Sequence, residues 1–122
     1  MNTWKTCKFG GTSVADADQI RKLEAIVRSD PQRRFVVVSA PGKRSAGDKK
    51  VTDLLYLLHE TAQNGIDISG ILSVIKKRYQ QIIDGLELKF DLEGEFEGIA
   101  AELTRQPRDF AASRGEYLNG KI

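Results

Sequence analysis

The sequence predicts an α/β fold built around a parallel sheet. Residues 4–9 and 35–38 are predicted strands because both are short runs with aromatic and β-branched side chains. Apolar residues at helical spacing lie between them, and a strand–helix–strand order within about forty residues implies a right-handed βαβ unit. The run at 35–38 is continuous rather than alternating, which is typical of a strand covered on both faces.

The first helix is predicted to begin just after the Gly10-Gly11 pair. Ser13 to Asp16 has the spacing of a capping box, in which the serine hydroxyl accepts an amide and the acid favours the positive helix end. The helix is expected to end near Ser29, because the following Asp30-Pro31 step disfavours α geometry.

The rest of the chain has helical patterns. Leucines at 54–58 predict one helix with Thr52 or Asp53 as its N-cap, and Ser69 is the predicted cap of the next. Two more helices are predicted around residues 92–103 and from Phe110 onward. An α/β sheet normally has about five or six strands, so we expect either a fragment of a larger domain or partner chains that supply the missing layers.

Composition excludes several classes of protein. The 122 residues are 40% hydrophobic, enough for a core, and carry a net charge of +2, which gives no argument for nucleic acid or an anionic membrane as partner. The N-terminus has no apolar signal region, and Cys7 is the only cysteine. We therefore expect a cytoplasmic protein with no nucleic-acid partner and no membrane partner. With His59 as the only histidine, no metal site is expected.

Three stretches carry candidate functional residues. The first, from Lys8 to Ser13, follows the first strand, and its two glycines, hydroxyls and one ammonium could form a cradle for phosphate or carboxylate. Its glycine and lysine spacing is not that of a Walker A loop. The alternative to a binding cradle is an ordinary glycine turn with a lysine on the protein surface. A lysine at the end of a buried strand argues against that alternative, because its ammonium needs water or a counterion.

The second stretch begins at Ser39, after the second strand, and continues to Thr52. Ser39 and Thr52 are candidate ligands for a small polar molecule, whereas each basic residue between them is expected to belong to a mobile, solvated loop. The third stretch is the tetrapeptide ending in Glu116, whose carboxylate could hold an ammonium group. Lys76, Lys77 and Arg78 are predicted to lie on a solvated helix face, and Trp4, Tyr79 and Phe96 in the core.

The segments KFGGTSVAD, VVVSAPGK, VTDLL and SRGE, in this order, resemble the N-terminal part of aspartate kinases, members of the amino acid kinase superfamily. The resemblance covers essentially the whole chain. It implies an αβα three-layer sandwich with a mainly parallel sheet, of which residues 1–122 form the N-terminal, amino-acid-substrate part. The ATP-binding half and the ACT domains are then absent, and we expect the isolated chain to lack kinase activity.

The resemblance also implies a reaction. Aspartate kinases transfer the γ-phosphoryl group of MgATP, a co-substrate rather than a tightly bound cofactor, to the side-chain carboxylate of L-aspartate. The product, 4-phospho-L-aspartate, leads to lysine, threonine and methionine. Lys8 would neutralise the transferring phosphate, and the amides of Gly10 and Gly11 would hold phosphate oxygens. The implied aspartate pocket consists of Thr12, Ser13, Ser39, Thr52 and Glu116, with Glu116 on the substrate ammonium.

Two alternatives remain open at this stage. The chain could belong to another amino acid kinase, such as a glutamate or carbamate kinase, although KFGGTS and SRGE argue against those. It could also be a non-catalytic aspartate-binding or regulatory module. We further expect a homo-oligomer, and an unpaired sheet edge offers one route to assembly.

Overall fold

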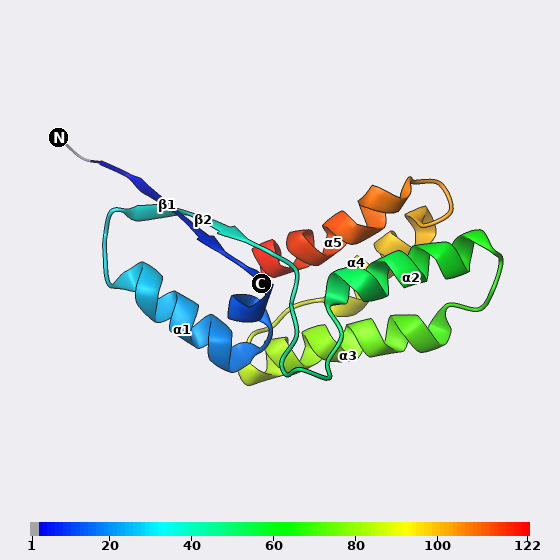
Figure 1. Cartoon of the computed structure of the whole chain (residues 1–122), viewed down its shortest axis with the longest axis horizontal. Helices are drawn as coiled ribbons and strands as arrows, with labels where there is room; N and C mark the ends of the chain where they lie inside the picture. The colour runs from blue at the N-terminus through cyan, green and yellow to red at the C-terminus, as the bar shows by residue number, and fades with distance from the viewer. Residues whose placement is uncertain (1–2) are drawn as a thin grey trace.

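Two strands lie side by side near one end of the molecule, and the later helices pack together beside them (Figure 1). The computed structural model describes residues 3–122. In chain order the elements are β1 (Lys5–Phe9), the 3-10 helix η1 (Gly11–Val14), α1 (Ala17–Arg28), β2 (Arg33–Val38), α2 (Val51–Gln63), α3 (Ser69–Gly85), α4 (Leu92–Glu102) and α5 (Arg108–Lys121).

The two strands form a parallel pair. Residues Thr6 to Phe9 align one by one with Phe35 to Val38, after a shift of register between Lys5 and Thr6. Helix α1 connects the strands and runs beside them (Figure 1). The predicted α/β class and parallel pairing are confirmed. Because both strands end at the same edge, the loops that follow them are neighbours.

The sheet is largely exposed. Phe35, Val36 and Val37 are 56%, 42% and 48% exposed, so the prediction that this strand is covered on both faces is wrong for the described residues. The reason is that residues 3–122 supply two strands and few contacts onto β2 from α1 and α5. Trp4, predicted in the core, is also exposed and has the Arg34 guanidinium 4.8 Å from its ring centre.

The hydrophobic core lies among the helices instead. Apolar residues recur every three or four positions on α3 and α4, which gathers them on one side of each helix. The fully buried side chains include Leu55, Leu58, Ile75, Tyr79, Phe96, Leu103 and Leu118. The predicted core positions of Tyr79 and Phe96 are confirmed, and their ring centres are 6.2 Å apart. In the part of the chain that the structure describes, no helix is long and apolar enough to span a bilayer.

The helix starts differ from those predicted. The α1 cap is Asp16, whose carboxylate accepts from the Gln19 amide at 2.9 Å, because Ser13 is taken up in the preceding 3-10 turn. Thr52 and Asp53 lie inside α2, whose first amide, on Val51, donates instead to the Pro41 carbonyl at 3.0 Å.

Helix α3 also starts without the expected cap. Ser69 is its first residue rather than its cap, and the Ser69 hydroxyl donates to the Asp67 carboxylate at 2.8 Å. The Ser69 amide donates to the same carboxylate at 3.0 Å, so an acid two residues upstream satisfies it.

Replacement of Leu55 by Ala tests the position of the core. Leu55 is fully buried, so Leu55→Ala should lower the free energy of unfolding by about 2–5 kcal/mol. The matched control is Leu57→Ala on the same helix, where the side chain is 44% exposed and the loss should stay below about 1 kcal/mol. Urea unfolding measures both, and equal losses would contradict this core.

Candidate functional site

A pocket of about 400 Å³ lies at the edge where the two strands end. Its walls come from the first loop (residues 10–16, after β1), the second loop (residues 39–50, after β2), the start of α2, and α5. The residues that line it are Gly11, Thr12, Ser39, Ala40, Pro41, Gly42, Lys43, Lys50, Thr52 and Glu116. Its size is that of sites for small molecules.

The two loops meet at a pair of glycines. The Gly42 amide donates to the Gly11 carbonyl oxygen at 2.8 Å. A Cβ atom on Gly42 would lie 2.6 Å from the Gly11 carbonyl carbon, and one on Gly11 would lie 3.1 Å from the Gly42 Cα. The backbones therefore approach more closely than a side chain at position 42 permits. Sequence reasoning gave Gly42 no role.

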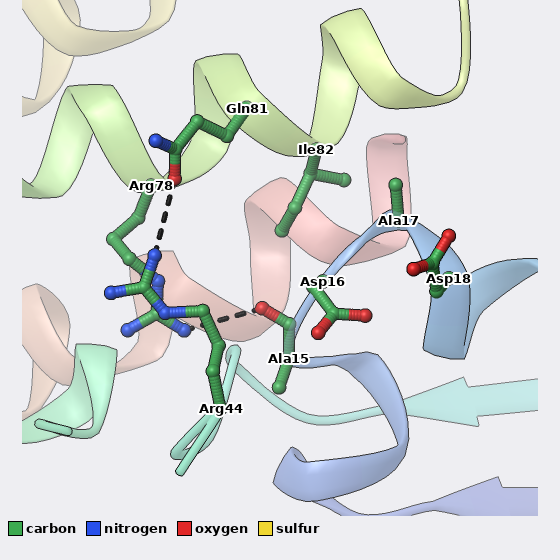
Figure 2. A pocket seen from close by; sticks show the side chains of 8 residues that line it. All are labelled: Ala15, Asp16, Ala17, Asp18, Arg44, Arg78, Gln81 and Ile82. Carbon is green, nitrogen blue, oxygen red and sulfur yellow. Dashed lines mark hydrogen bonds between the residues drawn. The ribbon is translucent and has the colours of Figure 1, made fainter. Parts of the chain in front are cut away.

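The buried side chain of Arg78, on α3, donates hydrogen bonds to both loops. Its Nη2 donates to the Gly42 carbonyl at 2.8 Å and to the Ala15 carbonyl at 3.3 Å, and its Nη1 donates to the Lys49 carbonyl at 2.9 Å. Figure 2 shows the side chain reaching from α3 toward Ala15. Arg78 is 5% exposed, so its predicted place on a solvated face is wrong.

The sequence did contain a signal for this burial. Arg78 follows the buried Ile75 by three residues and precedes the buried Ile82 by four, which places it on the apolar side of α3. Its charge suggested a solvated position, but its spacing indicated a buried one.

An ion pair organises the second loop. Arg44 Nε donates to Asp48 Oδ2 at 2.7 Å, and Arg44 Nη1 donates to Gln81 of α3 at 3.1 Å (Figure 2). The hydrogen bond from the Arg44 side chain holds the pKa of Asp48 well below its usual range. Arg44 therefore ties the loop to α3 but is itself exposed, and the predicted solvation of the basic residues in this loop is confirmed. Lys43 and Lys50 are exposed, but both line the pocket.

Helix α5 brings Glu116 to the opposite wall. A Cβ on the preceding Gly115 would lie 2.5 Å from the Ala40 Cβ, so α5 packs directly on the second loop. The buried Tyr79 hydroxyl donates to the Gly115 carbonyl at 2.9 Å, and burial raises the pKa of this phenol. The Asn119 amide donates to the Ser39 carbonyl at 2.9 Å. These contacts hold the exposed Glu116 at the pocket.

The structure brings most of the candidate residues together. Gly11, Thr12, Ser39, Thr52 and Glu116 line this one pocket. Three candidates lie outside its lining. Lys8 and Gly10 are exposed at the end of β1 and the start of the first loop, and Ser13 lines a neighbouring polar pocket that shares Thr12 and Lys43 with this one.

The charges at the pocket are of both signs. Lys43 and Lys50 supply ammonium groups, Glu116 supplies a carboxylate, and the hydroxyls can donate or accept hydrogen bonds. Such a wall suits a small molecule that carries both carboxylate and ammonium groups. Among residues 3–122, no three His, Cys, Asp or Glu side chains are grouped so as to hold a metal ion.

These features define an α/β protein with a polar, charged pocket beyond the carboxyl ends of its parallel strands. No family model matches the chain. Aspartokinase 3 of Bacillus subtilis is 44% identical over 97% of this chain, which spans 28% of that protein. Bifunctional aspartokinase/homoserine dehydrogenase 1 of Arabidopsis thaliana is 34% identical over 99% of this chain, which spans 14% of that protein.

Solved structures give the same result. The aspartate kinase of Clostridium acetobutylicum superposes with a TM-score of 0.91 and 41% identity, over 95% of this chain and 27% of that one. Aspartokinase III of E. coli, in complex with aspartate and ADP, has a TM-score of 0.70 and 30% identity, over 93% of this chain and 26% of that one. The chain is therefore a homologue of the aspartate kinases and matches an N-terminal part of them.

Replacement of Gly42 by Ala tests the contact between the loops. The added Cβ has no room beside Gly11, so Gly42→Ala should lower the free energy of unfolding by about 1–3 kcal/mol. The control is Gly47→Ala in the same loop, where nothing lies within 4 Å of the added Cβ and the change should stay within about 0.5 kcal/mol. Thermal unfolding measures both, and a neutral Gly42→Ala would show that the loops are not in contact.

Proposed function

We propose that this chain is the amino-acid-substrate part of an aspartate kinase, which transfers the γ-phosphoryl group of ATP to the side-chain carboxylate of L-aspartate and forms 4-phospho-L-aspartate. The observation that carries the proposal is the pocket itself, which gathers hydroxyls, two lysines and Glu116 from three separate stretches. The kinship with aspartate kinases supports the choice of substrate. An E. coli relative whose structure holds aspartate and ADP supports the pair of ligands.

The charge of each lining residue indicates which group of the ligand it would bind. Glu116 would accept hydrogen bonds from the substrate ammonium, and Lys43, Lys50 and the hydroxyls of Thr12, Ser39 and Thr52 would donate to carboxylates. The side-chain carboxylate of aspartate is already ionised at pH 7, so the chain need not supply a base. Catalysis then depends on position and on neutralisation of charge.

Phosphate would be bound at the edge of the pocket nearest β1. Lys8 is exposed where β1 runs into the first loop, which leaves its ammonium in water and available to a phosphoryl group. The amides of Gly10 and Gly11 would hold phosphate oxygens, and Ser13 would complete the substrate wall. MgATP is the co-substrate, and the chain needs no resident cofactor.

Three broader features belong to the same proposal. The exposed apolar side chains of β2 favour further layers that cover the faces of the sheet, as in an αβα three-layer sandwich with residues 1–122 as its N-terminal part. Exposed strands also favour assembly into a homo-oligomer. We place the protein in the cytoplasm, because a single cysteine fits a reducing compartment.

Calorimetric titration tests the function. The chain should bind L-aspartate, and Glu116→Gln should weaken binding by about tenfold or more, because a charge-assisted hydrogen bond contributes about 1.5–3 kcal/mol. The matched control is Glu97→Gln, an exposed carboxylate on α4 that should leave the affinity unchanged.

The alternatives predict different results in this titration or in an assay of phosphoryl transfer. Tighter binding of L-glutamate than of L-aspartate would indicate another amino acid kinase. Aspartate binding by the complete parent enzyme without phosphoryl transfer from ATP would indicate a non-catalytic binding module. Absence of aspartate binding by the chain would contradict the proposal.

A further inference from the structure

We propose that Arg78 is a positioning residue, whose guanidinium holds the first and second loops at the separation that forms the pocket and so sets its affinity for ligand. Arg78 itself does not line the pocket, and α3 contributes no residue to that lining. The nature of the ligand rests on the proposed function, whereas the role of Arg78 in holding the loops does not.

The geometry of the guanidinium carries the inference. One nitrogen, Nη2, donates to a carbonyl from each loop, at Ala15 and at Gly42, and the other, Nη1, donates to Lys49 near the end of the second loop. A planar group with fixed donor directions therefore joins one backbone point of the first loop to two points of the second. An ammonium group is a single point charge and cannot bind all three in the same directions.

Burial of the Arg78 guanidinium costs free energy, which argues that Arg78 has a specific role. A guanidinium at 5% exposure loses most of its hydration, and this burial lowers the pKa of Arg78. Three carbonyls and the carboxylate of Asp48, 3.5 Å from Nη1, offset that loss. Asp48 is itself bound by Arg44, whose positive charge also lowers the pKa of Arg78, so the loop compensates the buried charge only in part.

The link to the pocket passes through Gly42. Its carbonyl oxygen accepts from Arg78, and its amide donates to the Gly11 carbonyl. Gly42 and Gly11 both line the pocket, so their spacing determines its width on that side. Loss of the guanidinium would free the Gly42 carbonyl and loosen the contact between the loops.

Two variants and one control test the proposal. Arg78→Lys keeps the charge but not the planar guanidinium, and Arg78→Ala removes both. Lys77→Ala changes an exposed neighbour on α3. Amide hydrogen exchange should be about tenfold faster at Gly42 in both Arg78 variants and unchanged at the core residue Leu55. Affinity for L-aspartate should fall by about tenfold in both, and Lys77→Ala should match the parent chain in each measurement.

Rescue separates positioning from general stability. Guanidinium ion at tens of millimolar should restore slow exchange at Gly42 and aspartate affinity in Arg78→Ala, because it fits the space left by the side chain. Urea, which has the same shape without charge, should restore neither.

Several outcomes would overturn the proposal. Unchanged exchange at Gly42 in both Arg78 variants would do so, and so would unfolding of the whole chain by Arg78→Lys, since Arg78 would then be a folding residue. If exchange at Gly42 becomes faster in the variants but the unsubstituted chain binds no aspartate, the loops are held as proposed and the proposed function fails. Faster exchange with unchanged aspartate affinity would show that the loop separation does not set affinity.

Discussion

The backbone contact between Gly11 and Gly42 is the constraint on which the rest of the site depends. Each glycine belongs to a loop that leaves a parallel strand, and the amide of one binds the carbonyl of the other at 2.8 Å. A side chain on Gly42 would separate them. The pocket lies beside this contact, and both glycines belong to its lining.

The two parts of the molecule make different contributions. The strands bring the loops to one edge, but they are exposed and add little to the core. The helices hold that edge in place: α3 binds the loops through Arg78, and α5 packs on Ala40 through Gly115. Most of the residues that would touch a ligand lie on the two loops, whereas Thr52 and Glu116 lie on α2 and α5. Buried polar and small residues of the helices position the loops.

The parallel strands, the helices and the convergence of three stretches were predictable from sequence, because apolar spacing and the shared edge of parallel strands follow from local rules. Gly42 was missed because its role depends on a contact across the fold, and Arg78 was missed because its charge was weighed above its helical spacing. Asp16 replaced Ser13 as the cap because a 3-10 turn comes first. Exposure of β2 was not predictable, since it depends on what else covers the sheet.

The most direct test of a single shared pocket is a nuclear magnetic resonance titration of the ¹⁵N-labelled chain with L-aspartate. Backbone amides of Thr12, Gly42 and Glu116 should shift together and follow one binding curve, while amides at the far ends of α3 and α4 stay in place. Shifts in only one of these three segments, or three curves with different midpoints, would contradict a shared site.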